Sequence, residues 1–495
     1  MYLLGYDLGS SSVKAALVDA QTKRTVALMQ QPQTEMLISS PHPGWAEQDP
    51  EVWWEHVCAL TQELLNIQGV DAGDIKGIGI AYQMHGLVLV DRNLEVLRPS
   101  IIWCDSRAVD IGEEAFMQLG RDKCLRHLLN SPGNFTASKL KWVQMHEPQI
   151  YQKIHKMLLP GDYLAMKLTG NLHTTISGLS EGILWDFDKG QVADFLMDHY
   201  GIDSNMIPDQ VPTFGIQGEV DAEAAQLSGL QAGTPVCYRA GDQPNNALAL
   251  NVMAPGEVAA TGGTSGVVYG IVDKPTFDEQ VRVNSFAHVN YREDNPSIGV
   301  LLCINGAGIQ YRYLKQLLHG PETPYEEIEK LAASVPVNSE GLRIIPFGNG
   351  AERVLGNKDL GSQVINLQLN RHGPAHLYRA ALEGIAFSFV YGMEVLQEMG
   401  LNLNIIKVGN DNLFQSQVFS ATISETLQCE IQMVETTGAL GAAFASGIAI
   451  QLYSDMDQAL GDNPVLHTFT PEGEGAHQQG YEIWKNDLQR LVDKT

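Results

Sequence analysis

Three short hydrophobic runs, separated by polar turns, open the chain. Residues 2–9 (YLLGYDLG) are mostly apolar, residues 13–20 (VKAALVDA) alternate, and residues 23–30 (KRTVALMQ) follow a Gln-Thr-Lys turn. A period of two over four to eight residues is typical of a β-strand. We therefore predict a strand–turn–strand–turn–strand unit over the first 32 residues.

Helices further along are indicated by capping residues and by apolar positions at helical spacing. Asp49 precedes Pro50, a combination typical of a helix start, so a helix should run over 50–66. Gly400 should end the longest helix. The remaining expected elements are strands at 75–83 and 404–410 and helices at 110–119, 138–146, 308–318, 375–399 and 438–450.

The first turn region recurs half a chain later. Residues 7–19 read DLGSSSVKAALVD and residues 261–273 read TGGTSGVVYGIVD, with five identities in 13 positions at an offset of 254. Each copy follows a strand, opens with a Gly-Ser/Thr turn and enters a second strand, as expected if one domain core occurs twice. A chance likeness between two common hairpins is the alternative. We place the boundary near 245–256 and expect domains at 1–248 and 249–495.

Length and net charge narrow the function classes. The chain has 495 residues, and a single hydrophobic core stops growing near roughly 250–300 residues, so two domains agree with the length. Asp and Glu number 58 against 32 Lys and Arg, a net charge of -26. So acidic a surface repels phosphate backbones and anionic lipid headgroups, which argues against nucleic-acid or membrane partners. An anionic substrate would need positive charge supplied locally, by a metal ion or by helix N-termini.

The sequence has no pattern of a secretion signal or a membrane anchor. Residues 1–5 lead into Asp7 without a basic segment or a small-residue cleavage site. The longest uncharged stretch, 436–454, is rich in Gly and Ala, which favours a buried helix over a membrane span. The six cysteines show no CxxC spacing, as expected for reduced thiols rather than for disulfides or a zinc site. We therefore expect a cytoplasmic protein.

The loop from Asp7 to Lys14 has the chemistry of a phosphate site. An Asp that ends a buried strand can hold Mg²⁺ through a water, while the N–H groups and hydroxyls of a Gly-Ser turn face phosphate oxygens. Lys14 would add a positive charge. A plain β-hairpin explains the same residues, since Gly and Ser favour turns. The second copy at 261–266 strengthens the phosphate interpretation, because two facing hairpins would clamp a triphosphate.

Asp242 follows another apolar run, in the segment AGDQPNNA at 240–247, beside the expected domain boundary. There it could act as a general base on a substrate hydroxyl, which phosphoryl transfer uses to orient the nucleophile and accept its proton. An Asx-turn that caps the following helix is the competing interpretation.

Nine segments spread over the chain form a recognisable set. They read DLGSSSVK at 7–14, PHPGWAEQDPEVWW at 41–54, YQMHGLVL at 82–89, NFTASKLKWVQMHEP at 134–148, LLPGDYLAMKLTG at 158–170, AGDQPNNA at 240–247, GGTSG at 262–266, HGPAHLYRAALEGIAFSF at 372–389 and GALGAAFASG at 438–447. In this order they resemble the FGGY carbohydrate kinase family over nearly the whole chain. Within the family the resemblance is strongest to kinases that act on D-xylulose.

This resemblance implies an α/β fold of two ribonuclease-H-like domains, of the actin/hexokinase superfamily, with ATP and sugar in the interdomain cleft. It implies ATP-dependent phosphorylation of a ketopentose, first of all D-xylulose to D-xylulose 5-phosphate, with Mg²⁺ as cofactor. Asp242 falls on the catalytic base and Asp7 on the carboxylate that holds Mg²⁺ through water. The sugar contacts fall on Met84, His85, Asp242 and Gln243, and the phosphate and nucleotide contacts on Gly9, Ser10, Ser11, Ser12, Lys14, Gly263, Thr264, Ser265, Gly306, Gln310, Gly409 and Asn410.

Several departures from the family pattern leave the substrate and the phosphate donor open. Gln243 follows the catalytic Asp where kinases of D-xylulose usually carry Asn, and residues 351–355 (AERVL), Asn366 and 409–411 (GND) also differ. The alternative acceptors are therefore ribulose, glycerol, gluconate, fuculose and sedoheptulose. Further alternatives are a catalytically weak sugar sensor and, from another class, a nucleotide-dependent binding module such as actin. The sequence does not decide whether the protein is a homodimer.

Overall fold

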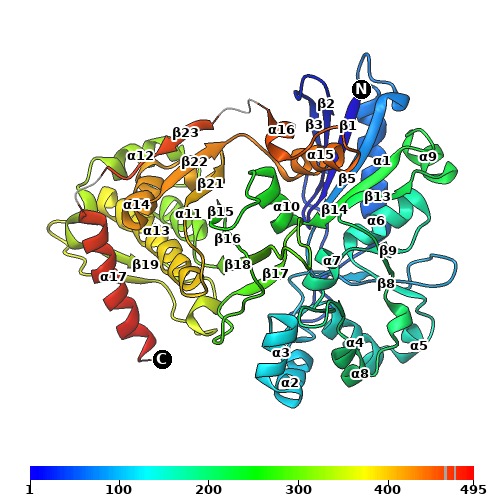
Figure 1. The fold of residues 1–495 in the computed structure, drawn as a ribbon. Helices are drawn as coiled ribbons and strands as arrows, with labels where there is room; N and C mark the ends of the chain where they lie inside the picture. Colours follow the sequence, from blue (N-terminus) through cyan, green and yellow to red (C-terminus); the bar gives the residue numbers. More distant parts are fainter. Residues whose placement is uncertain (462–464, 473–474, 495) are drawn as a thin grey trace.

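The structure is a computed structural model that describes residues 1–461, 465–472 and 475–494. It has two lobes, each built around one mixed β-sheet (Figure 1). The first sheet comprises, in chain order, β1 (Tyr2–Leu8), β2 (Val13–Asp19), β3 (Thr25–Gln31), β5 (Ile75–Tyr82), β13 (Phe214–Glu219) and β14 (Pro235–Gly241). The second comprises β15 (Glu257–Gly262), β16 (Gly266–Val272), β17 (Asn284–Ala287), β18 (Ile298–Ile304), β21 (Ile405–Gly409), β22 (Glu430–Val434) and β23 (Val465–Phe469).

The two sheets repeat one pairing pattern. The first has the order β3-β2-β1-β5-β14-β13, and the second has the order β18-β16-β15-β21-β22-β23 with β17 added outside β18. In both, the first three strands pair antiparallel, the next two steps are parallel and the last is antiparallel. The hairpins at 7–19 and 261–273 are β1–β2 and β15–β16, which occupy the same place in the two sheets. The duplicated core that the repeat predicted is confirmed.

The helices agree with the expected ones where local capping was clear. The side chain of Asp49 accepts a hydrogen bond from Glu51 N and starts α1 (Pro50–Leu65), and α11 (Gly308–Leu318) has the expected bounds. The other expected helices are α2 (Val109–Leu119), α4 (Thr136–His146), α13 (Pro374–Glu398) and α15 (Gly438–Ala449). The further helices are α3 (Arg121–Leu128), α5 (Pro148–Tyr151), α6 (Pro160–Thr169), α7 (Ile176–Glu181), α8 (Asp194–Tyr200), α9 (Ala222–Ser228), α10 (Asp242–Ala249), α12 (Tyr325–Ala333), α14 (Gln417–Leu427), α16 (Met456–Leu460) and α17 (Ala476–Val492).

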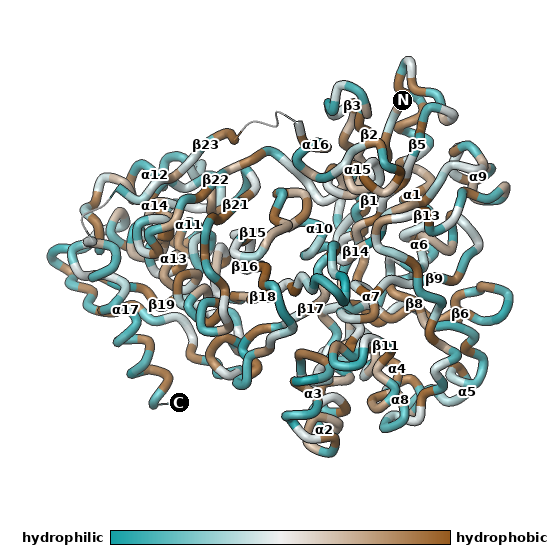
Figure 2. The backbone as a smooth tube through the Cα atoms, viewed as in Figure 1, coloured by the Kyte–Doolittle hydropathy of each residue, from teal (hydrophilic) through white to brown (hydrophobic). Residues whose placement is uncertain are grey.

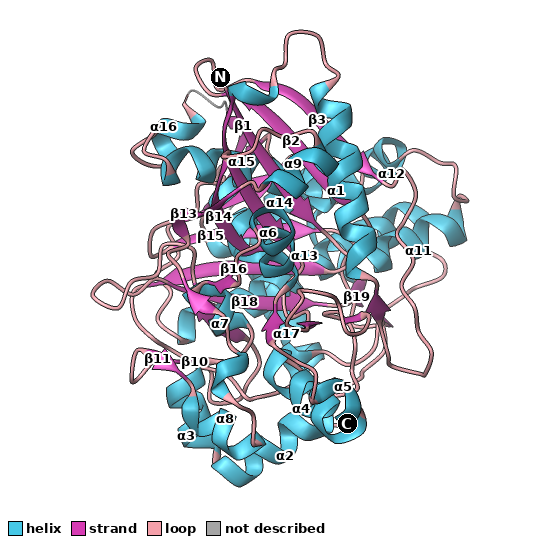
Figure 3. Cartoon of the chain, turned by 90° about the vertical axis from the view of Figure 1, so that its right-hand side faces the viewer, coloured by secondary structure: helices cyan, strands magenta, loops and turns pink. Residues whose placement is uncertain are grey.

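Both faces of the first sheet are covered by helices. Successive residues of a strand point to opposite faces of the sheet, so alternate residues contact different helices. Leu4, Tyr6 and Leu8 pack with the apolar side chains of α1 and α6. Leu3 and Ala16 belong instead to a cluster with α15. Helices α2, α3, α4 and α8 gather at the lower end of this lobe in both views (Figures 1 and 3).

Helix α15 follows the second sheet in sequence but packs on the first. A Cβ added at Gly5 or at Gly79 would overlap backbone atoms of α15, so these glycines allow the helix to lie directly on the strands. Asn245 Nδ2 of α10 donates to Gly438 O at 2.9 Å, which joins α10 to the start of α15 between the lobes. The expected domain bounds, 1–248 and 249–495, divide the chain by sequence, whereas α15 packs on the sheet of the other half. We retain these bounds as a prediction.

The hydropathy of the chain matches this burial. The tube in Figure 2 is brown along much of the central strands and teal along many outer loops. The uncharged stretch at 436–454 forms the buried helix that was expected, with most of α15 inaccessible. Across the described ranges, no helix combines the length and the apolarity that a membrane crossing requires. The six cysteines are free thiols, in agreement with the sequence.

Candidate active site

Two carboxylates lie at the carboxyl ends of neighbouring parallel strands. β5 lies between β1 and β14, and Leu8 and Gly241 both face Tyr82 in the register. Asp7 is the penultimate residue of β1. Asp242 comes directly after the last residue of β14 and is the first residue of α10. Ligands of open α/β sheets bind beyond the carboxyl ends of the strands. The sheet thus brings together two residues that are 235 positions apart.

The two carboxylates interact electrostatically. Burial, and next the negative charge of Asp7, raise the pKa of Asp242 from 3.8 to about 7, although hydrogen bonds from the Gln243 backbone and side chain oppose the rise. Burial also raises the pKa of Asp7, against the positive charge of Lys14. A carboxyl group with a pKa near the working pH is well matched to general-base catalysis.

Met84 and His85 lie just beyond the end of β5, between these two strands. Met84 is buried, and His85 has a left-handed backbone with φ +63°. Lys139 Nζ donates to the carbonyl oxygen of His85 at 2.8 Å and holds this turn. Burial is the main reason that the pKa of His85 falls to about 3, so the ring is neutral.

The tautomer of His85 follows from its partner. Nδ1 lies 2.9 Å from the carbonyl oxygen of Glu181, and because a carbonyl only accepts, Nδ1 carries the proton. Nε2 is then an acceptor for a ligand hydroxyl. The ring packs against Phe135 of the first lobe and Phe286 of β17, at centroid distances of 4.8 and 5.4 Å. The sugar position of the sequence analysis thus lies where the two lobes meet.

The first hairpin turn, which the sequence analysis assigned to phosphate, is closed by backbone and side-chain hydrogen bonds. Gly9 N donates to Ser12 O at 3.0 Å, and Ser10 O accepts from Gln48 Nε2 at 2.6 Å, which fixes the turn. Ser11 and Lys14 are exposed. The charge of Lys14 counteracts the burial that raises the pKa of Asp411, so this lysine lies near the loop that follows β21.

The second hairpin turn is tied to the start of α11. Gly308 N donates to Gly263 O at 3.0 Å and Ile309 N donates to Thr264 O at 3.1 Å. Thr264 and Ser265 are exposed, and no side chain at Gly263 screens the backbone. The turn is therefore held rigidly while its outer side stays accessible.

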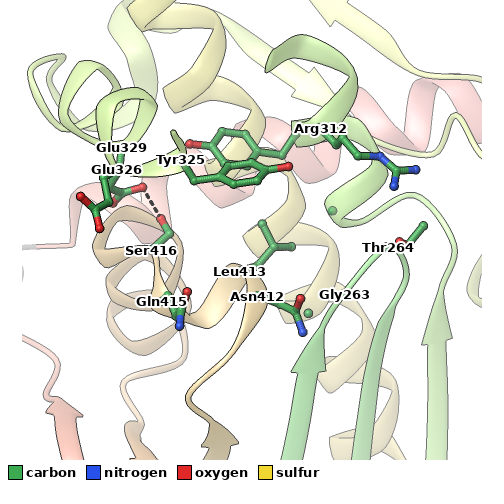
Figure 4. A pocket seen from close by; sticks show the side chains of 13 residues that line it. Gly263, Thr264, Arg312, Tyr325, Glu326, Glu329, Asn412, Leu413, Gln415 and Ser416 are labelled. Carbon is green, nitrogen blue, oxygen red and sulfur yellow. Dashed lines mark hydrogen bonds between the residues drawn. The ribbon is translucent and has the colours of Figure 1, made fainter. Parts of the chain in front are cut away.

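A cavity of about 460 Å³ opens beside this turn (Figure 4). Tyr311 and Tyr325 stack in it with ring centroids 5.6 Å apart. Thr264 and Arg312 line one side, and Glu329, whose carboxylate accepts from Ser416 Oγ at 2.7 Å, lies on the other. Cavities of this size, with aromatic walls and a few polar groups, are typical of small-molecule sites.

The cavity takes up some of the predicted nucleotide residues but not all. Its complete lining is Gly262, Gly263, Thr264, Gly308, Tyr311, Arg312, Tyr325, Glu326, Glu329, Asn412, Leu413, Gln415 and Ser416. Gly306 and Gln310 lie next to lining residues but are not part of the lining. Gly306 precedes α11, where its N–H donates to Glu352 Oε1 at 2.9 Å, and Gln310 lies on α11. Gly409 and Asn410 precede the lining loop, and Asn410 Nδ2 donates to Glu435 at 3.0 Å.

Sequence reasoning missed the walls of this cavity. Tyr325, Glu326 and Glu329 come from α12, which follows the second hairpin by more than 50 residues and carries no motif. Asn412 and Gln415 lie within five residues of Asn410, so the neighbourhood of that residue could have suggested them.

The residues at the strand ends fit a magnesium ion. Burial disfavours the charged form of both Asp7 and Asp242, and the charge of Asp7 adds to this effect at Asp242, so a divalent cation would supply a favourable counter-charge. Within the described part of the chain, no group of three or more His, Cys, Asp or Glu side chains is arranged to hold a metal. Mg²⁺ commonly uses only one or two carboxylates together with waters and substrate phosphates. The donor set therefore suits an ion that is held jointly with a bound phosphate.

Comparisons with known proteins identify the family of the chain. The N-terminal domain of the FGGY family of carbohydrate kinases matches residues 2–249, and its C-terminal domain matches residues 258–450. Xylulose kinase of Escherichia coli K12 is 29% identical, over 99% of this chain and 99% of its own length. L-xylulose/3-keto-L-gulonate kinase of the same organism is 30% identical, over 99% of this chain and 95% of its own.

A solved structure extends the likeness to three dimensions. The crystal structure of xylulose kinase from Rhodospirillum rubrum superimposes with a TM-score of 0.89 at 28% identity, covering 100% of this chain and 99% of that one. The two family matches span the first sheet, the second sheet up to β22, and both hairpin turns. The chain belongs to the FGGY family of carbohydrate kinases.

Proposed function

We propose that this carbohydrate kinase transfers the γ-phosphoryl group of ATP to a ketopentose, with D-xylulose as the first candidate and D-xylulose 5-phosphate as its product. The observation that carries the proposal is the position of Asp242, a carboxyl group with a pKa of about 7 that directly follows Gly241, the residue packed closely against Met84. A base of this kind can accept the proton of an attacking hydroxyl group, which a module that only binds a nucleotide does not need.

In this mechanism the oxygen of a sugar hydroxyl bonds to the γ-phosphorus of ATP, and the bond between that phosphorus and ADP breaks. Asp242 accepts the proton that the sugar hydroxyl loses. Gln243 hydrogen-bonds the Asp242 carboxylate and steadies it. His85 Nε2 accepts from another sugar hydroxyl, and Met84 packs against the carbon skeleton. Burial of this region keeps out water that would otherwise take the phosphoryl group.

The nucleotide side of the proposal uses both hairpins and the cavity. The turns at Gly9–Ser12 and Gly263–Ser265 offer backbone N–H groups and hydroxyls to the phosphates, with Lys14 as an added positive charge. The cavity beside Thr264 would receive the nucleoside, and Gly306, Gln310, Gly409 and Asn410 support its lining. Mg²⁺, held by Asp7 through water, would neutralise phosphate charge when bound.

The names of the matched relatives bear on the identity of the acceptor. One relative is named xylulose kinase, and another is named for L-xylulose and 3-keto-L-gulonate. The substrates in these names are ketoses or keto acids, which supports a keto sugar over glycerol as the acceptor. A sugar-sensing role with weak turnover is the second candidate, favoured by the altered segments at 351–355 and 409–411.

A coupled assay of ADP release tests the proposal. The enzyme with Mg-ATP is given D-xylulose, L-xylulose, D- and L-ribulose, L-fuculose, glycerol, gluconate or sedoheptulose. We expect kcat/KM for D-xylulose to exceed the others by about tenfold or more, roughly 1.4 kcal/mol in transition-state binding. A higher value for another acceptor would replace D-xylulose in the proposal. Sugar binding without turnover of any acceptor would favour the sensor.

A further inference from the structure

A second carboxyl group lies beside the proposed sugar site, and the mechanism above does not use it. Glu181 is the last residue of α7 and is 2% exposed. Its carbonyl oxygen accepts the hydrogen bond from His85 Nδ1 at 2.9 Å. One end of this residue therefore already positions a sugar-binding side chain.

The carboxyl group of Glu181 points to the end of β14. A Cβ added at Gly241 would lie 2.6 Å from Glu181 Oε2 and 2.6 Å from Met84 Cγ. Gly241 immediately precedes Asp242, and Met84 immediately precedes His85. The carboxyl thus sits among the residues proposed to hold the sugar, and only a glycine at position 241 leaves it room.

The carboxyl group of Glu181 is poorly hydrogen-bonded within the protein. Neither oxygen has a hydrogen bond of normal geometry to any described residue. The Tyr82 hydroxyl and the backbone N–H of His85 lie close enough to act as hydrogen-bond donors that lower the pKa of Glu181, but neither contact has normal geometry. Buried polar groups nearly always have well-formed hydrogen bonds, so a poorly bonded carboxyl group beside a ligand site indicates a ligand contact.

Burial and nearby negative charge favour the protonated form of Glu181. Burial, and next the negative charge of Asp242, raise the pKa of Glu181 well above 4.5, and the carboxyl of Asp162 acts in the same direction. When it is protonated, the group has one O–H donor and one carbonyl acceptor. Of two neighbouring carboxyl groups, one can act as a base and the other as a hydrogen-bond donor.

We propose that Glu181 is a sugar-contacting residue that helps to select the acceptor. Its carboxylic acid donates one hydrogen bond to a keto or hydroxyl oxygen of the sugar and accepts another, while a separate hydroxyl faces Asp242. The inference rests on the proposed function, because it takes the sugar site at Met84, His85 and Asp242 as given. It assigns to this site a polyhydroxylated ketose rather than a small polyol with fewer oxygens.

Two variants separate this role from a structural one. Glu181→Gln keeps the shape, a hydrogen-bond donor and a hydrogen-bond acceptor, whereas Glu181→Met keeps the length and removes both the donor and the acceptor. We expect Glu181→Gln to change the KM for the sugar by less than about fivefold. We expect Glu181→Met to raise it at least tenfold, with the KM for ATP within twofold of wild type and no loss of melting temperature. An unchanged sugar KM in Glu181→Met would overturn the inference.

A deoxy sugar gives the second measurement. If a hydroxyl contacts Glu181, the ketose lacking that hydroxyl binds wild type more weakly but binds Glu181→Met as the parent sugar does. Equal losses in both proteins for every deoxy position would overturn the contact. This comparison stays informative if Glu181→Met lowers stability, because it compares two sugars on the same protein.

The wild-type panel keeps this test apart from the proposed function. If wild type phosphorylates another ketose and not D-xylulose, the substrate proposal fails and the variants are assayed with that ketose. If wild type uses D-xylulose and Glu181→Met does so equally well, only the Glu181 inference fails. Calorimetry that finds no sugar bound to wild type would overturn both.

Discussion

Asp7 and Asp242 end two strands that flank β5, and the charge of Asp7 adds to burial in raising the pKa of Asp242 to about 7. The same pair serves two purposes in the proposed reaction. Asp242 is a base strong enough to take a proton from a hydroxyl, and Asp7 offers the oxygen ligand that suits a magnesium ion beside the phosphates.

The pH dependence of the reaction should report Asp242. Because only the ionised carboxylate accepts a proton, we expect kcat/KM for the sugar to fall about tenfold per pH unit below a midpoint near 7. The measurement is kcat/KM at saturating Mg-ATP from pH 5 to 9. Asp7→Asn, whatever its effect on the rate, should move the midpoint down by removing a like charge. A flat profile between pH 6 and 8 would contradict the assignment.

Removing the base should separate turnover from binding. We expect Asp242→Asn to lower kcat by about 10²–10⁴-fold, since this is the usual contribution of general-base catalysis. Sugar affinity by calorimetry should stay within a few-fold, because Asn keeps the shape. Near-normal turnover in a folded variant would remove Asp242 from this role.

The same substitution should raise stability at alkaline pH. The pKa of Asp242 is higher in the folded protein than its ordinary value of 3.8, so the folded state binds this proton more tightly than the unfolded state does. The stability contributed by the protonated form is present below about pH 4 and is lost as pH rises through about 7. Asp242→Asn should therefore melt a few degrees above wild type at pH 8, with the difference shrinking toward pH 4. An equal difference at both pH values would argue against ionisation as the cause.

His85 should act as a neutral ligand of the sugar. We expect His85→Ala to raise the sugar KM about tenfold or more, since the acceptor Nε2 and the ring contact are lost together. The KM for ATP should change less than twofold. Because the pKa of His85 is about 3, the wild-type KM should show no histidine titration between pH 5.5 and 8. A matched rise in both KM values would instead indicate a general loss of lobe packing.

The junction of α15 with the first sheet should be intolerant of a single methyl group. A Cβ at Gly79 would overlap the Ala442 carbonyl, and backbone cannot be displaced as a flexible side chain can. We expect Gly79→Ala to cost about 1–3 kcal/mol or more of stability in denaturant melts. Gly373→Ala is the control, because nothing lies within 4 Å of its added Cβ. A cost at Gly79 no greater than at Gly373 would mean that the helix can shift.

The sequence alone determined the elements whose causes are local. The hairpins at 7–19 and 261–273, the cap at Asp49 and the bounds of α11 follow from turn residues and side-chain periodicity within a few positions. The repeat also predicted that the core is duplicated, since both copies carry the same local pattern. Asp242 was found in the same way, as an acidic residue at a strand end.

Only the tertiary structure decided which distant residues share a site. No spacing in the chain brings Tyr325 of α12 beside Thr264, or places α15 on the first sheet rather than on the second. Glu181 was missed for a related reason: in sequence it is an ordinary acidic residue at the end of a short helix. Its raised pKa arises because packing removes water from the carboxyl group and sets it against Asp242. Solvation and charge proximity are properties of the folded arrangement, so they cannot be read from residue order.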